Sequence, residues 1–168
     1  MARPLWSDFS REYFDYVNFD SATVKKKIGG EVNEAMITNT CAVRMSRGLN
    51  YSNLPVPARF SGLRTVKGGD DMRYAYKVAD MRKWLPTNDA LGQPDLDLRK
   101  KQGEDFDKTT LKDMKGIIAF DIHFSDATGH LDRWDGTQFS HESGHSTDFG
   151  DAGRYWALAT RITLWALK

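Results

Sequence analysis

The chain has 168 residues, with 24 basic and 23 acidic side chains and a formal net charge of +1. This length fits one domain with a hydrophobic core, so we expect a single domain over residues 1–168. The balanced charge argues against nucleic acid as a main partner, because no surplus of Lys and Arg supplies a phosphate-binding surface. The single cysteine rules out an internal disulfide, so the fold must rest on its core.

The N-terminal segment predicts neither export nor membrane insertion. Its sequence, MARPLWSDFSREYF, has no apolar signal-peptide region, and no stretch of the chain approaches the length of a membrane span. We therefore expect a protein made in the cytoplasm without a signal peptide. If it acts elsewhere, a route other than the general secretory route must deliver it.

Two helices are predicted in the first third of the chain. Residues 21–28, SATVKKKI, are typical of a short helix with Ser21 as its N-cap. A second helix is expected over about 40–49, because Asn39 and Thr40 are suitable N-cap residues and an apolar face follows at helical spacing.

The cysteine of the chain, Cys41, lies at the start of this second helix. A thiol in a first helical turn is near the positive end of the helix dipole and near free backbone N–H groups. Both favour the thiolate. A lone cysteine is more often a small buried apolar residue, so its position makes Cys41 a candidate nucleophile only if a base lies nearby.

The middle of the chain is less regular. Residues 51–62 carry two prolines and predict an extended loop, and residues 76–85 predict a helix that Pro86 ends. Residues 86–115 are polar and charged. They predict a surface segment with one helical turn near 97–102.

The last third of the chain changes to strand patterns. Apolar residues alternate over 116–124, which indicates a strand with one buried face, and 130–134 and 159–167 predict two more strands. Helices first and an antiparallel sheet afterwards indicate an α+β fold. A helix that carries a cysteine can then pack on a sheet that carries a histidine.

Four histidines are candidates for the base, and one stands out by position. His130 follows Gly129 at the start of a predicted strand, where a side chain can project into a cleft and where glycine allows close backbone approach. His123 lies opposite the apolar stripe of its strand and is taken as a surface residue. A cysteine nucleophile needs such a base, usually distant in sequence, and a third group that orients the imidazole.

Two segments together resemble a known family. TNTCAVRMSRGLN (38–50) and SDATGHLDRWDG (125–136) resemble the type VI secretion amidase effectors of family 4, which are papain-like cysteine peptidases of the NlpC kind. KKKIGGEV (25–32) and MKGIIAF (114–120) fit the family's pattern in place and order. The resemblance implies a papain-like fold in which an N-terminal helical part with the cysteine packs on an antiparallel sheet with the histidine.

The same resemblance implies a function. It implies hydrolysis of an amide bond in a peptidoglycan stem peptide, namely the bond between the γ-carboxyl of D-glutamate and meso-diaminopimelate. Type VI secretion machinery would deliver the protein to the periplasm of a rival bacterium, and a cognate immunity protein would neutralise it in the producer. No cofactor or metal is expected.

Carried over by position, Cys41 is the nucleophile and His130 the general base. The family commonly has an aspartate eleven residues after the histidine, where this chain has His141. We expect His141 to orient the imidazole, with Asp132 and Asp148 as alternatives. Asp132 lies two residues after His130 on the same strand face, where neighbouring side chains run parallel and rarely form a good orienting bond. The Cys41 backbone N–H and one unidentified donor would hold the oxyanion.

Two other functions are compatible with parts of the sequence. HESGH at 141–145 matches the zinc-peptidase pattern H-E-x-x-H, which needs a helix, whereas its Gly- and Ser-rich surroundings predict a loop. A structural or adventitious metal bound by His141, His145 and Asp148 is favoured over zinc catalysis at this segment. A wall-binding module with an impaired site is the other alternative, and the missing aspartate is its support.

Overall fold

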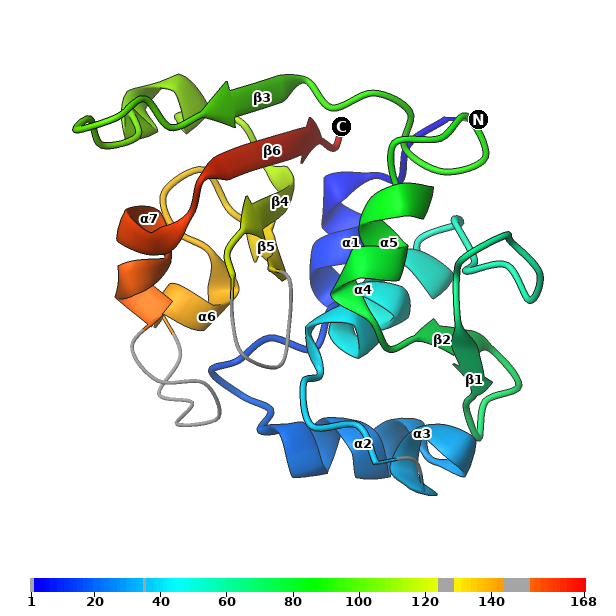
Figure 1. Ribbon diagram of the computed structural model, residues 1–168. Coiled ribbons are helices and arrows are strands. Elements are labelled where there is room, and N and C mark those ends of the chain that lie inside the picture. The colour runs from blue at the N-terminus through cyan, green and yellow to red at the C-terminus, as the bar shows by residue number, and fades with distance from the viewer. Residues whose placement is uncertain (1, 35, 124–128, 144–151) are drawn as a thin grey trace.

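The computed structural model describes residues 2–34, 36–123, 129–143 and 152–168, and it has an α+β fold (Figure 1). The helices are α1 (Trp6–Glu12), α2 (Ser21–Ile28), α3 (Gly30–Glu34), α4 (Cys41–Asn50), α5 (Val78–Trp84), α6 (Ser140–Ser143) and α7 (Tyr155–Leu158), with 3-10 turns η1 (Lys108–Leu111) and η2 (Ala152–Arg154). The strands are β1 (Thr65–Lys67), β2 (Arg73–Ala75), β3 (Leu96–Arg99), β4 (Gly116–Asp121), β5 (His130–Trp134) and β6 (Arg161–Ala166).

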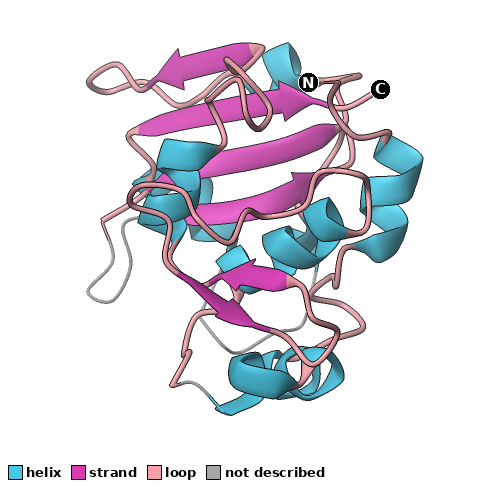
Figure 2. Cartoon of the chain, turned by 90° about the vertical axis from the view of Figure 1, so that its right-hand side faces the viewer, coloured by secondary structure: helices cyan, strands magenta, loops and turns pink. Residues whose placement is uncertain are grey.

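The central sheet is antiparallel, with the strand order β3-β6-β4-β5 (Figure 2). Ile118 of β4 lies opposite Asp132 of β5 and opposite Leu164 of β6. The expectation that β4 has one buried face was wrong, because both Ile117 and Ile118 are fully buried. Each face of the strand is covered by helices, so an apolar side chain is favoured at every position.

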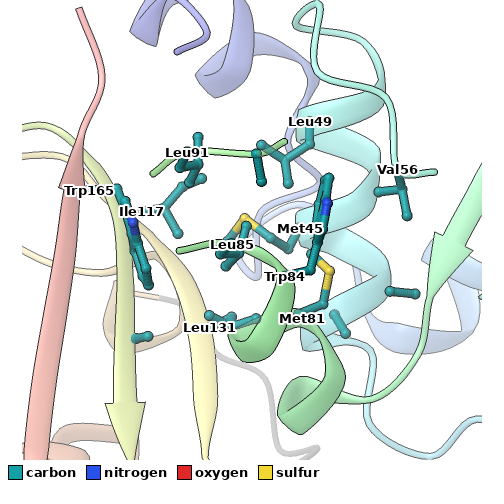
Figure 3. Close-up of a cluster of buried hydrophobic side chains, with 14 of the residues drawn as sticks. Met45, Leu49, Val56, Met81, Trp84, Leu85, Leu91, Ile117, Leu131 and Trp165 are labelled. Carbon is teal, nitrogen blue, oxygen red and sulfur yellow. The ribbon is translucent and has the colours of Figure 1, made fainter. Parts of the chain in front are cut away.

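Two apolar clusters lie on the two faces of this sheet. On one face, side chains of α4 and α5 pack against the sheet residues Ile117, Leu131 and Trp165 (Figure 3). On the other face, Ile118 and Phe120 pack with residues around α6 and α7. The sheet is therefore a middle layer, and β5 is one of its edges.

A smaller unit of α2, α3 and the β1–β2 hairpin lies next to α4 and shares a third apolar cluster with it (Figure 1). Helix α2 forms as predicted, but its N-cap is Asp20 and not Ser21. The Asp20 carboxylate accepts a hydrogen bond from the Thr23 backbone N–H at 2.7 Å.

The segment 86–115 differs from the sequence prediction. The expected helical turn near 97–102 is wrong, because residues Leu96–Arg99 form β3 and pair with β6. Leu96 and Leu98 alternate with Asp97 and Arg99, and the two leucines are half-buried while the two charged residues are exposed. Four residues are too few to show this alternation clearly in a charged context.

Within the part of the chain that the structure describes, no helix has the length and apolar character needed to span a membrane.

Candidate active site

Cys41 is the first residue of α4, as the capping pattern predicted, and its side chain is fully buried. The carboxamide of Asn39 lies just ahead of the helix, whose N-cap residue is Thr40. The Asn39 Oδ1 atom accepts a hydrogen bond from the Cys41 backbone N–H at 2.9 Å and another from the Cys41 thiol. Because a backbone N–H only donates, the atom that faces it must be the carboxamide oxygen.

His130 begins β5, and its Nδ1 atom lies 3.2 Å from the Cys41 Sγ atom. Gly129, just before β5, allows the backbone to lie close against β4, as expected from the sequence. Its φ is +142°, and a Cβ atom there would lie 2.4 Å from the Phe120 carbonyl oxygen. Any larger residue at 129 would push the start of β5, and with it His130, away from β4.

Asp132 lies on the other side of the imidazole, and its Oδ2 atom is 3.1 Å from His130 Nε2. Three further donors hold the buried carboxylate: the Tyr13 hydroxyl at 2.8 Å and the backbone N–H groups of His141 and Arg133, each at 2.7 Å. His130 and Asp132 are same-face neighbours on β5 and nevertheless form a close orienting contact, contrary to the expectation from ideal strand geometry. A carboxylate only accepts, so the facing Nε2 carries a proton.

His141 lies in α6, and its ring stacks on Tyr16, with 4.2 Å between centroids and 14° between planes. Its Nδ1 atom is 3.3 Å from the Tyr155 hydroxyl, and its ring centroid is 5.3 Å from that of His130. The structure thus brings His141 into the site through its backbone N–H to Asp132, while the Asp132 side chain contacts the imidazole.

The remaining sequence candidates fall partly outside the described residues. His145 and Asp148 lie in 144–151, which the structure does not describe. The expectation of a loop at HESGH was wrong for its first residues, because Ser140–Ser143 form the helical turn α6. Among the described residues, no group of three or more His, Cys, Asp and Glu side chains is arranged to hold a metal ion.

The three side chains Cys41, His130 and Asp132 perturb one another electrostatically. Burial raises the pKa of the Cys41 thiol, but the charge and hydrogen bond of His130 outweigh it, and the pKa falls below its ordinary value. Burial lowers the pKa of His130, but the Cys41 thiolate and the Asp132 carboxylate raise it to about 9. Burial raises the pKa of Asp132, but His130 and the other donors hold it below its usual range. These shifts ease the transfer of the thiol proton from Cys41 to His130.

Sequence reasoning missed two tyrosines. Tyr13 and Tyr16 follow α1, and the Tyr16 backbone N–H donates to Ser140 Oγ at 3.0 Å, which holds this segment against α6. The Tyr16 ring lies between His141 and the guanidinium of Arg44, 3.8 Å from the latter. The sequence around them, EYFDYVNF, contains no catalytic motif, and only the tertiary packing shows their role.

The family of the chain follows from its similarity to known proteins. The family model for the type VI secretion system (T6SS) amidase effector protein 4, Tae4, matches residues 37–165. The chain is similar to Tae4 of Enterobacter cloacae in its effector–immunity complex with Tai4, with 33% identity, a TM-score of 0.81 and 99% of each chain covered. No curated protein gave a significant match.

Two further solved structures are similar over their whole length. Tae4 of Enterobacter cloacae is 31% identical with a TM-score of 0.79, and 100% of each chain is covered. The effector–immunity system Tae4/Tai4 of Salmonella typhimurium is 30% identical with a TM-score of 0.75, and 99% of each chain is covered. The papain-like α+β fold that the resemblance implied is thereby confirmed, and the chain belongs to the type VI secretion amidase effector 4 family.

Proposed function

We propose that this protein is an antibacterial cysteine amidase that hydrolyses an amide bond in the peptide stem of peptidoglycan. The observation that carries the proposal is the 3.2 Å approach of His130 Nδ1 to Cys41 Sγ, with Asp132 on the far side of the imidazole. Membership of the amidase effector 4 family supports the same reaction class. Residues Cys41, His130 and Asp132 then act as nucleophile, general acid–base and orienting group.

The reaction begins with proton transfer from the Cys41 thiol to His130 Nδ1. The thiolate attacks the carbonyl carbon of the stem-peptide amide, so that an S–C bond forms and the carbonyl electrons move to oxygen. As the oxyanion collapses, the C–N bond breaks and His130 gives its proton to the leaving amine. Water then hydrolyses the thioester, releases the carboxyl product and restores the thiol.

Asp132 keeps the imidazole in its working orientation. Because its carboxylate faces Nε2, the other nitrogen is turned to the sulfur, and the imidazolium that forms has a neighbouring negative charge. His141 acts indirectly, because its backbone N–H donates to Asp132 and not to the imidazole of His130. We therefore assign the third role to Asp132, and a supporting role to His141.

We further propose that the bond cut is the one between the γ-carboxyl of D-glutamate and meso-diaminopimelate, as the family resemblance implies. Type VI secretion machinery delivers the protein to the periplasm of a rival cell. A cognate immunity protein protects the producer, in line with the effector–immunity complexes solved for Tae4 and Tai4 of Enterobacter cloacae and Salmonella typhimurium.

Digestion of purified sacculi followed by mass spectrometry tests the reaction and the bond together. Wild-type protein should release fragments whose masses identify the cleaved amide, and Cys41→Ala and His130→Ala should release none. The matched control is His123→Ala, which changes an exposed histidine and should cleave like wild type. Cleavage by Cys41→Ala at the wild-type rate would overturn the proposal.

The wall-binding alternative loses its main support. It relied on the absence of an aspartate at position 141, but Asp132 supplies a buried carboxylate to the imidazole. An impaired module predicts an unreactive thiol, whereas the amidase predicts a thiol that iodoacetamide alkylates at neutral pH.

A further inference from the structure

The carboxamide of Asn39 lies where a substrate carbonyl would have to bind. Its Oδ1 atom accepts the Cys41 backbone N–H at 2.9 Å and also contacts the Cys41 thiol. That backbone N–H is the donor that the sequence reasoning reserved for the oxyanion. In the structure it is already occupied by an oxygen of the same protein.

The position of this oxygen matches what catalysis requires of a substrate. An oxyanion donor should lie about 2.7–3.1 Å from the oxygen that it stabilises. Asn39 Oδ1 lies 2.9 Å from the Cys41 backbone nitrogen and also contacts the Cys41 thiol, and it is itself an amide carbonyl oxygen. Asn39 is half-buried, so it is partly in contact with solvent.

The same contact affects the charge on the sulfur. The Asn39 oxygen only accepts, and its orientation is fixed by the Cys41 N–H, so it favours S–H over a thiolate. His130 favours the opposite state. The other described groups that face Cys41 are Asp132 on β5 and Tyr13 and Tyr16 after α1, with Arg44 one turn further along α4. Asn39 differs from these groups in that its oxygen is placed to accept a hydrogen bond from the Cys41 thiol.

We infer that Asn39 is a positioning residue that keeps the empty site at rest: its carboxamide fills the oxyanion position and retains the thiol proton until a substrate amide displaces it. Displacement frees the Cys41 N–H for the oxyanion and removes the acceptor that held the proton. Proton transfer to His130 then becomes favourable. The inference rests on the proposed function for the identity of the displacing group, an amide carbonyl.

Thiol reactivity without substrate tests this inference. Because the chain has one cysteine, both thiolate ultraviolet absorbance and iodoacetamide alkylation report on Cys41 alone. Asn39→Ala removes the acceptor and should increase the alkylation rate at pH 7 by about 2- to 10-fold, the effect of one neutral hydrogen bond. Asn39→Asp still accepts the N–H but places a negative charge beside the sulfur, so it should decrease the thiolate fraction and the rate.

A matched control separates this effect from loss of a helix cap. Asp20→Ala removes the cap of the neighbouring helix α2 and should leave the alkylation rate of Cys41 unchanged. If Asn39→Ala and Asn39→Asp both slow alkylation, or if neither changes it, Asn39 only supports the start of the helix and the inference is overturned.

Hydrolysis of muropeptides provides the second readout. Asn39→Ala should raise kcat/KM by about the same 2- to 10-fold, because the substrate no longer competes with the side chain. A large fall in kcat despite faster alkylation would show that Asn39 stabilises the oxyanion, and would overturn the resting role. If wild type hydrolyses no muropeptide while the alkylation order holds, the proposed function fails and the inference about Asn39 stands.

Discussion

The imidazole of His130 and the carboxylate of Asp132 are in contact, with 3.1 Å between Nε2 and Oδ2, although only one residue separates them on β5. The strand is an edge of the sheet, so this pair is open to the segment after α1, which supplies the Tyr13 hydroxyl. With four donors around it, the buried carboxylate stays ionised at neutral pH. It can therefore orient and charge-stabilise the imidazolium.

Substitutions of Asp132 and His141, the two candidates for the orienting residue, should lower kcat to different extents. Asp132→Asn removes the charge next to His130 and should lower kcat by about 10²- to 10³-fold. His141→Ala leaves the backbone N–H to Asp132 in place, so we expect a loss of about 10-fold or less. Steady-state kinetics on a purified muropeptide measure both values. The reverse order would place His141 and not Asp132 against the imidazole.

The pH profiles of hydrolysis and alkylation should separate above neutrality. The pKa of His130 is raised to about 9, so the proton that it donates to the leaving amine is lost as the pH rises through that value. Hydrolysis should therefore fall on the alkaline side, whereas alkylation, which needs only the thiolate, should not. In Asp132→Asn the alkaline fall should move to lower pH, because one cause of the raised pKa is gone. A hydrolysis rate that keeps rising well above pH 9 contradicts this assignment.

Replacing Gly48 by alanine, which adds only a methyl group, should destabilise the protein. Gly48 lies on α4 against Phe9, and a Cβ atom at this position would be 2.6 Å from Phe9 Cε2. Overpacking costs about 1–3 kcal/mol, while replacing a helical glycine by alanine gains up to about 1 kcal/mol. Gly48→Ala should thus lower the free energy of unfolding by about 1–2 kcal/mol in urea denaturation. The loss should shrink in a Phe9→Leu background, and an equal loss there would show that Phe9 is not the cause.

Gly129→Ala should impair catalysis because it displaces His130, without changing any catalytic side chain. The new Cβ would collide with the Phe120 carbonyl oxygen, and the shift of β5 should move His130 away from Cys41. Since misplacement by about 1 Å can cost about 10²-fold, we expect a loss of that size in kcat/KM. Gly103→Ala is the matched control, because its φ is also positive but no atom lies within 4 Å. Equal activity losses in the two variants would attribute the effect to backbone strain in general.

Sequence patterns predicted those parts of the molecule that depend on local chemistry. The start of α4 at Cys41 and the start of β5 at His130 follow from capping and alternation, and both are confirmed. The partners of these residues depend on tertiary contacts. Tyr13 reaches Asp132 across 119 residues of sequence, and no local pattern carries that information. The contact of His130 with Asp132 was missed for another reason, because ideal strand geometry understates how far two side chains at a sheet edge can turn toward each other.

The joining of distant segments at this site also links reactivity to folding. Cys41 and His130 are 89 residues apart, and Tyr13 lies still further from Asp132. In an unfolded chain none of these groups meet, and the thiol has the ordinary reactivity of a free cysteine. The catalytic arrangement therefore exists only in the folded chain, and loss of the tertiary fold removes it completely.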